Sequence, residues 1–341
     1  MKKLPMAMPT ITSYPKHANL IAILRQHPSY NDWLYLNYIQ LQADFNQGVF
    51  WIDFYQPLSR LHYPLMEREA LRKATFFANS MSILSFICNS IDRQGYVYLY
   101  IDTYYISAYG NSGREHFPHD MLIYGYDAKS RVMYIADFFR GAYALTEASF
   151  EEVERAFHSP HISTYPEFVD IQLLRVLPEE KMVFDRSYCV QLMRDYVEAT
   201  NSSHRLALIE APRDEKTFYF GSAVYTPLMA HMESISPAYE VLRALHVLAD
   251  HKKLMYERAA FFLNTGILTG SSHGALLAQL EAIKDEALTI RNVYLKSMVK
   301  RTKDSSILGR LKALREIEAR VIAEFADQLE ASGAEKCCLP S

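Results

Sequence analysis

A histidine begins the first strand, and an aspartate ends the second strand, of a predicted β-hairpin in the middle of the chain. His119 precedes the apolar run 121–124, a turn begins at 125–127, and the next apolar run, 132–135, leads to Asp137. In an antiparallel pair joined by a short turn, the head of the first strand lies beside the tail of the second. A carboxylate beside an imidazole fixes its tautomer and orientation, as in a nucleophile-His-Asp apparatus. We therefore predict that His119 is a general base and that Asp137 is its orienting acid.

These residues also have ordinary structural explanations. A histidine at a strand end can bond to neighbouring backbone, and aspartate commonly ends a strand in a turn. Imidazole titrates near neutral pH, which suits a base. Asp120 should point to the opposite face from His119 if the strand is regular. His116 and Asp127 fit loop positions, although His116 could line the same cleft.

The hairpin segment "HFPHDMLIYGYD" resembles the papain-like cysteine peptidase and acyltransferase superfamily, in which an N-terminal helix supplies a cysteine before such a hairpin. The same hairpin segment, together with "GYVYLYIDTYYISAYG", "FYFGSAVY" and "LHVLADHKKLMYERAAFFL", makes the chain similar to the family of butirosin biosynthesis protein H, over roughly residues 30 to 320. This resemblance implies a papain-like fold and a role with acyl thioesters in peptide-antibiotic gene clusters.

The chain departs from that pattern at the nucleophile. No cysteine precedes Cys88, and the expected helix, near "NDWLYLNYIQLQ", offers Asp32, Trp33 and Asn37 instead. Cys88 lies in an apolar helical segment, and Cys189 lies in the helical half of the chain. Both fit buried, unreactive thiols, because free cysteine is among the most buried residue types. The chain therefore keeps a base and an acid without the thiol.

The predicted function is an acyltransferase or acyl-thioester-processing protein of secondary-metabolite biosynthesis, specifically of peptide natural products. Its partners would be an acyl or peptidyl carrier protein with a phosphopantetheine thioester and a small-molecule acceptor, without a cofactor. The alternative is a noncatalytic accessory or docking protein of a biosynthetic assembly line. A protease is disfavoured because peptide hydrolysis in this superfamily relies on the missing thiol. The predicted substrate-binding residues are His116, Asp120, Tyr104 and Tyr105.

A cluster of cations near the end of a long helix is the predicted carrier-docking site. The segment "LKSMVKRTK" contains all four, Lys296, Lys300, Arg301 and Lys303, over roughly two turns of helix. Positive charge there also complements the helix dipole, so a solvated helix end is the simpler explanation of the cluster, and a docking patch for an acidic carrier domain is the alternative.

Composition excludes several classes of function. The formal charge of −3 gives no basic footprint for broad nucleic-acid binding. No apolar run is long enough to span a bilayer, and no signal peptide is evident, so we expect a cytoplasmic protein, with a homodimer as one option. Four cysteines without framework spacing fit a reducing compartment. No metal site is predicted, because His246 and His251 are not spaced as ligands on one helix face.

The pattern of elements predicts an α+β fold with two domains. A papain-like domain with an antiparallel sheet should span residues 1–180, followed by an all-α helical bundle over 181–332 and a flexible tail over 333–341. Strands are expected at "VFWIDFY" and in the region 95–175, and helices at "NDWLYLNYIQLQ", "EREALRKATFF" and "SMSILSFICNSIDRQ". Ser149 and Glu152 should form a capping box at the start of a helix.

Overall fold

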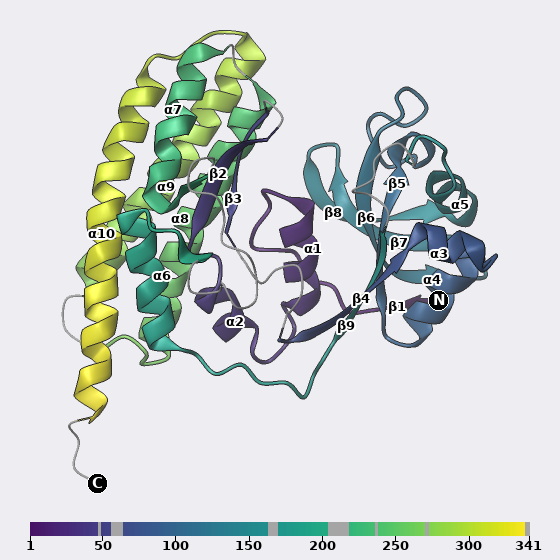
Figure 1. Ribbon diagram of the computed structural model, residues 1–341, viewed down its shortest axis with the longest axis horizontal. Coiled ribbons are helices and arrows are strands. Elements are labelled where there is room, and N and C mark those ends of the chain that lie inside the picture. Colours follow the sequence, from purple (N-terminus) through teal and green to yellow (C-terminus); the bar gives the residue numbers. More distant parts are fainter. Residues whose placement is uncertain are drawn as a thin grey trace. The chain divides into compact units, whose positions relative to one another are not determined.

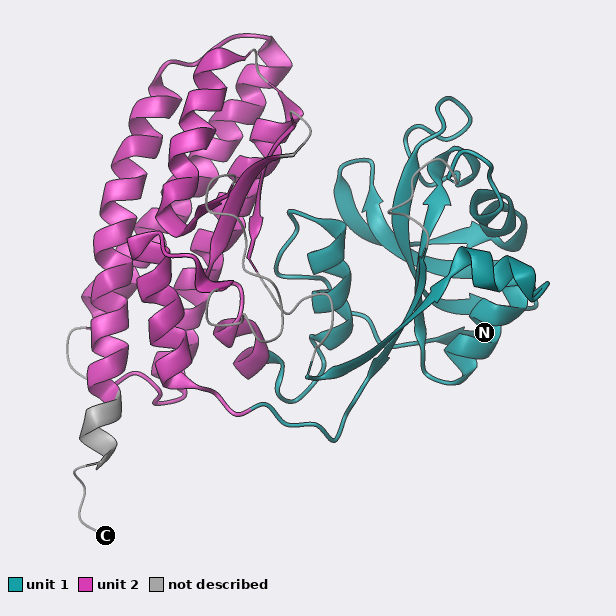
Figure 2. Cartoon of the chain, viewed as in Figure 1, with its two compact units in different colours: residues 1–30, 60–182 teal, residues 31–59, 183–341 magenta. Residues whose placement is uncertain are grey.

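The computed structural model describes residues 1–46, 49–55, 64–162, 170–203, 218–235, 238–269 and 273–337. The chain forms two compact units, coloured separately in Figure 2. Unit 1 comprises Met1–Tyr30 and Arg60–Met182, and unit 2 comprises Asn31–Ser59 and Val183–Ser341. Unit 1 is therefore interrupted in sequence by a segment that belongs to unit 2.

This division differs from the predicted one at the N-terminal side. The prediction assigned residues 1–180 to one domain, whereas Asn31–Ser59 fold with the C-terminal half. The physical reason is strand pairing, because β2 (Leu41–Asn46) and β3 (Val49–Phe54) form a hairpin that pairs with β10 (Tyr219–Phe220). At the other end, α10 continues to Cys337, beyond the predicted limit of residue 332, and residues 338–341 lie outside the described residues.

An antiparallel sheet forms the centre of unit 1. In the described residues its strands run in the order β4-β9-β5-β6-β7-β8, and β1 also pairs with β6. The bounds are β1 Lys2–Lys3, β4 Met66–Arg72, β5 Tyr96–Asp102, β6 Pro118–Asp127, β7 Val132–Phe139, β8 Ala142–Ser149 and β9 Asp170–Val176. Gly125 permits the close approach of β1, because a Cβ atom there would lie 2.5 Å from the carbonyl oxygen of Lys2.

Helices cover this sheet on both sides (Figure 1). Helix α1 (Pro15–Leu24) packs against β6 and β7, while α4 (Ile83–Asp92) and α5 (Phe150–Phe157) lie across the sheet from it and contact β5. Ser149 and Glu152 form the predicted capping box at the start of α5. Most of α1 is buried, so its apolar sequence is a core helix.

Two predicted helices are wrong in part. The segment predicted as one helix at 67–77 is β4 followed by the short helix α3 (Lys73–Ala78), because β4 pairs along its whole length with β9. The segment predicted as a helix at 31–42 is α2 (Tyr30–Leu36), and its last residues begin β2. Long-range strand pairing overrides local helix propensity in both places.

Unit 2 is dominated by long helices. They are α6 (Arg186–Glu198), α7 (Tyr225–Ser234), α8 (Tyr239–Asn264), α9 (His273–Lys300) and α10 (Ser306–Cys337). Helix α9 packs against both α8 and α10, and α8 also packs against β3. Two short 3-10 turns complete the described elements, η1 (Thr103–Tyr105) in unit 1 and η3 (Gly221–Val224) in unit 2.

The predicted fold class is confirmed. The chain is α+β, with an antiparallel sheet and with helices α8–α10 in its C-terminal region. Across the described ranges, every helix is too short or too polar to traverse a lipid bilayer.

Candidate active site

The predicted contact between His119 and Asp137 is confirmed. His119 is the second residue of β6, and Asp137 lies near the end of β7, its antiparallel neighbour. The distance from His119 Nε2 to Asp137 Oδ2 is 3.1 Å. The imidazole is 25% exposed and the carboxylate is fully buried, so the ring can reach solvent while its partner cannot. The chemical role of the pair stays a prediction.

Tyr109 holds the buried carboxylate from the loop before β6. Its hydroxyl donates a hydrogen bond to Asp137 Oδ2, and its ring packs edge-on against the ring of His119, with centroids 5.9 Å apart. Burial, together with the charge of Asp137, raises the pKa of Tyr109 well above its ordinary value, so the phenol keeps its proton and remains a donor. The second oxygen, Asp137 Oδ1, has no hydrogen-bond partner within the described part of the chain.

Asp120 approaches His119 from the other side of the ring. Its Oδ1 lies 3.6 Å from His119 Nδ1, although a regular strand would point the two side chains apart. Burial, reinforced by the charge of Asp137, raises the pKa of Asp120 to about 7. Because Asp137 faces Nε2, a proton on Nε2 leaves the lone pair on Nδ1 for base chemistry. Asp120 therefore lies beside the nitrogen that would accept a proton.

A second histidine-aspartate pair occurs at the head of the same strand. His116 Nδ1 forms a hydrogen bond of 2.7 Å with Oδ2 of Asp102, the last residue of β5. Asp102 was not among the predicted site residues. The antiparallel pairing of β5 and β6 brings the two residues together, because the tail of β5 lies beside the head of β6, with Asp102 opposite Pro118.

Four donors surround the Asp102 carboxylate. Besides His116, the hydroxyl of Ser159 donates to Oδ2 at 2.6 Å, and the backbone amides of Tyr104 and Phe117 donate to Oδ1. Burial alone would raise the pKa of Asp102, but these hydrogen bonds, led by that of Ser159, outweigh it and lower the pKa. Asp102 is therefore an ionised carboxylate in the interior.

The predicted substrate residues Tyr104 and Tyr105 lie around His116. Tyr104 stacks on the His116 ring with centroids 4.1 Å apart, and Tyr105 lies 5.9 Å away. His161 stacks on His116 at 3.8 Å. Tyr104, Tyr105 and His116 therefore form one aromatic group, whereas Asp120 belongs to the His119 pair.

Cys88 and Cys189 are poor nucleophiles. Cys88 is half-buried on α4, and burial followed by the charge of Asp92 raises its pKa. Cys189 is buried on α6, where burial raises its pKa to about 12. The thiolate is the reactive form, and a raised pKa leaves little thiolate at either residue near neutral pH.

Helix α1 packs on both strands that carry His119 and Asp137, while α4 contacts β6 and α5 contacts β7. The predicted nucleophile position, at Asp32, Trp33 and Asn37, falls instead on α2 and the turn after it, which fold in unit 2 apart from Tyr30. The sequence of α1, "PKHANLIAIL", contains neither cysteine nor serine nor threonine. A hydroxyl or thiol nucleophile is therefore missing from this helix too.

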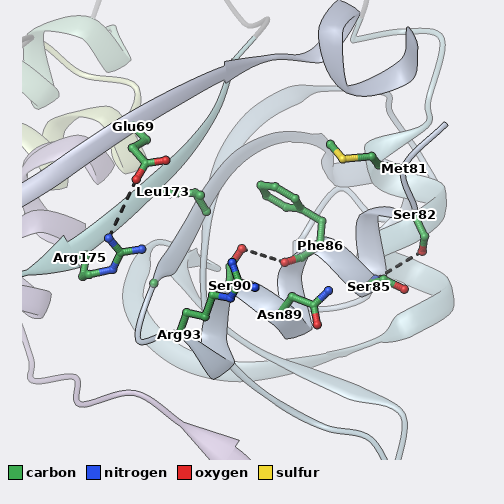
Figure 3. A pocket seen from close by; sticks show the side chains of 11 residues that line it. Glu69, Met81, Ser82, Ser85, Phe86, Asn89, Ser90, Arg93, Leu173 and Arg175 are labelled. Atoms are coloured by element: carbon green, nitrogen blue, oxygen red, sulfur yellow. Dashed lines mark hydrogen bonds and ion pairs between the residues drawn. The ribbon is translucent and has the colours of Figure 1, made fainter. Parts of the chain in front are cut away.

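A cavity of about 500 Å³ opens elsewhere in unit 1 (Figure 3). It is bordered by α4, β4, β9 and the turn before β5, and Phe86 and Leu173 contribute apolar surface. Arg175 and Glu69 lie beside each other on one side of it, with 4.0 Å between guanidinium and carboxylate. None of the predicted site residues lines this cavity.

The predicted docking cations occur together at the end of α9. Lys296, Lys300, Arg301 and Lys303 are all exposed, and none forms an ion pair with another described residue. They belong to unit 2, whereas both histidine pairs belong to unit 1. Among the described residues, no group of three or more acidic, histidine or cysteine side chains could hold a metal ion.

No protein-family model matches the chain, and no curated protein matches it either.

Proposed function

We propose that the protein is an acyltransferase, or a related acyl-thioester-processing enzyme, of secondary-metabolite biosynthesis, with His119 as general base and Asp137 as the residue that orients it. The observation that carries the proposal is the 3.1 Å contact between a partly exposed imidazole and a fully buried carboxylate. The resemblance of the hairpin segment to the butirosin biosynthesis protein H family supports the choice of substrate class.

In the proposed reaction, His119 Nδ1 accepts a proton from an amine or hydroxyl acceptor as its nitrogen or oxygen attacks the thioester carbonyl. The carbon-sulfur bond then breaks, and the proton passes to the departing thiolate. The charge of Asp137 stabilises the imidazolium that forms between these steps. Base catalysis of this kind contributes about 10² to 10⁴ in rate.

The transfer is direct in this proposal, without an acyl-enzyme intermediate. The high pKa of both Cys88 and Cys189 supports this choice, because an acyl-enzyme needs an activated nucleophile. The proposed partners are a carrier protein with a phosphopantetheine thioester, which docks on Lys296, Lys300, Arg301 and Lys303, and a small-molecule acceptor. We place the reaction in the cytoplasm, without a cofactor, and keep a homodimer as an option.

A noncatalytic role is the second candidate. The described cavity lies away from His119, and the α9 cations form no ion pair with a residue that the structure describes, which favours a protein that docks partners rather than converts them. In this candidate the His119 pair would only stabilise the strand ends, and carrier binding would be the whole activity.

The test uses acyl thioesters of N-acetylcysteamine as carrier mimics, together with a panel of small amines and alcohols. His119→Gln and Asp137→Asn should each lower product formation by about 10² or more. His158→Gln is the matched control, because His158 is an exposed histidine of the same unit. Cys88→Ala should leave the rate unchanged, and intact-mass spectrometry should find no acyl adduct on Cys88. An adduct there, or a His119 variant within threefold of wild type, would overturn the proposed mechanism.

A further inference from the structure

The His116 pair is not used by the reaction proposed above, yet it is the better aligned of the two. The contact between His116 and Asp102 is a hydrogen bond of 2.7 Å, shorter than the 3.1 Å between His119 and Asp137. An ionised carboxylate only accepts hydrogen bonds, so Nδ1 of His116 carries the proton. In the neutral ring the lone pair then lies on the other nitrogen, Nε2, and the imidazole is 32% exposed.

The surroundings fix this imidazole in place. Asp102 cannot swing away, because Ser159 and two backbone amides bind the same carboxylate. The rings of Tyr104 and His161 stack on the imidazole at 4.1 and 3.8 Å. A base whose orientation is set before substrate arrives needs little reorganisation during proton transfer.

A purely structural role accounts for Asp102 but not for His116. The carboxylate joins the two ends of the loop between β5 and β6 through the amides of Tyr104 and Phe117, and this needs no imidazole. A different aromatic ring at position 116 could also stack on Tyr104. What the imidazole adds is a nitrogen lone pair near the surface, held by a buried charge.

We propose that His116 is a second general acid-base site of unit 1, which activates water or a small alcohol for attack on an ester or thioester beside Tyr104 and His161. Nε2 accepts the proton of the attacking O–H as its oxygen bonds to the carbonyl carbon. The bond from that carbon to the leaving oxygen or sulfur then breaks, and Nε2 returns the proton to the leaving atom. With water the products are a carboxylic acid and an alcohol or thiol. This activity does not depend on transfer at His119.

The test measures hydrolysis of p-nitrophenyl acetate by the full chain, after subtraction of the buffer rate. His116→Gln and Asp102→Asn should each lower the protein's rate about tenfold or more. Ser159→Ala should lower it less, because Asp102 keeps three of its four donors. His158→Gln should retain the wild-type rate, because His158 is an exposed histidine of the same unit that belongs to neither histidine-aspartate pair.

Chemical rescue distinguishes a lost base from a lost contact. Free imidazole should restore turnover to His116→Ala, and the wild-type rate should fall in D₂O, since proton transfer is part of the step. Because Asp102 is buried, the Asp102→Asn variant is interpreted only if its circular dichroism spectrum matches that of wild type. If the spectra differ, the test rests on His116→Ala and Ser159→Ala. The inference is overturned if the rate of His116→Gln stays within twofold of wild type, or if the wild-type protein hydrolyses the ester no faster than buffer. It is also overturned if imidazole fails to restore turnover to His116→Ala.

Discussion

At the scale of single residues, Asp120 links the candidate site to pH. Its folded-state pKa is raised from 3.8 to about 7, mainly by burial and then by the charge of Asp137. The folded protein therefore retains a proton between about pH 4 and 7 that the unfolded chain has already lost. The stability that this group contributes is present below pH 4 and is lost as the pH rises toward 7.

Asp120→Asn should remove this dependence. Wild type should lose stability relative to the variant as the pH rises from 4.5 to 7, by up to about 1.4 kcal/mol per pH unit. Urea unfolding of both proteins at several pH values measures the difference. A difference that stays constant with pH, or that grows in favour of wild type, would contradict the raised pKa.

The sequence identified the residues of the site only in part. His119 and Asp137 could be paired because a two-strand hairpin with a short turn fixes which ends meet. Asp102 at the tail of β5 also lies beside the head of β6, but residues 103–117 separate the two strands, so the short-turn rule did not identify it. Tyr109 was out of reach, because it lies in the irregular loop between β5 and β6, where no repeating pattern indicates the direction of a side chain.

At the scale of elements, four helices of unit 2 converge on one buried ion pair. Lys252 of α8 lies 2.7 Å from Glu318 of α10, and both side chains are fully buried. Tyr196 of α6 and Tyr225 of α7 each donate a hydroxyl hydrogen bond to the same carboxylate. The ion pair thus has hydrogen-bond partners besides its own two charges. Removal of one charge leaves the other buried without its counter-charge.

Lys252→Met should destabilise the protein by about 3–5 kcal/mol, because the Glu318 carboxylate loses its counter-charge. The double variant Lys252→Met with Glu318→Leu should cost less than the sum of the two single changes. The neighbouring Lys253→Met is the control, because its ion pair with Glu257 is partly exposed and should contribute less than about 1 kcal/mol. Urea denaturation measures all four variants. Additive costs in the double variant would show that the two charges do not act as a pair.

The helices of unit 2 were predictable, whereas β4 was not. Long amphipathic runs such as α8 carry their own periodic signal. In contrast, "MEREALR" is rich in helix-forming residues, and only its pairing with β9, about a hundred residues later, makes it a strand. Such pairings are set by the tertiary fold, so a local pattern cannot reveal them.

At the scale of the whole molecule, unit 2 is built from two separated stretches of chain. Arg258 of α8 is fully buried, and its guanidinium donates hydrogen bonds to the backbone carbonyls of Tyr35 and Asn37. His251 of the same helix bonds to the carbonyl of Ile39. The N-terminal stretch therefore completes the interior of the C-terminal helices. The change from a strand-type to a helix-type sequence pattern near residue 180 indicated one boundary. It could not reveal that residues 31–59 fold with the C-terminal helices.

A fragment of residues 183–341 should consequently be unstable. Without the 31–59 segment, the Arg258 guanidinium loses its backbone acceptors, and a buried cation without partners is strongly unfavourable. Circular dichroism during urea titration should show an unfolding midpoint much lower than that of the full chain, or a loss of helical signal without cooperativity. A fragment that unfolds cooperatively at the midpoint of the full chain would show that the 31–59 segment is dispensable.

The central claim, that His119 acts as a general base, is tested most directly by measuring turnover and binding on the same samples. The substrate is an acyl thioester on a phosphopantetheine-bearing carrier protein, and the variants are His119→Ala and the charge reversal Lys300→Glu with Arg301→Glu. We expect His119→Ala to lower turnover by about 10² or more while carrier binding stays near wild type. The charge reversal should weaken binding in a salt-dependent manner. Turnover within a few-fold of wild type in His119→Ala, with the greater loss in the charge-reversal variant, would contradict the claim and favour a docking protein.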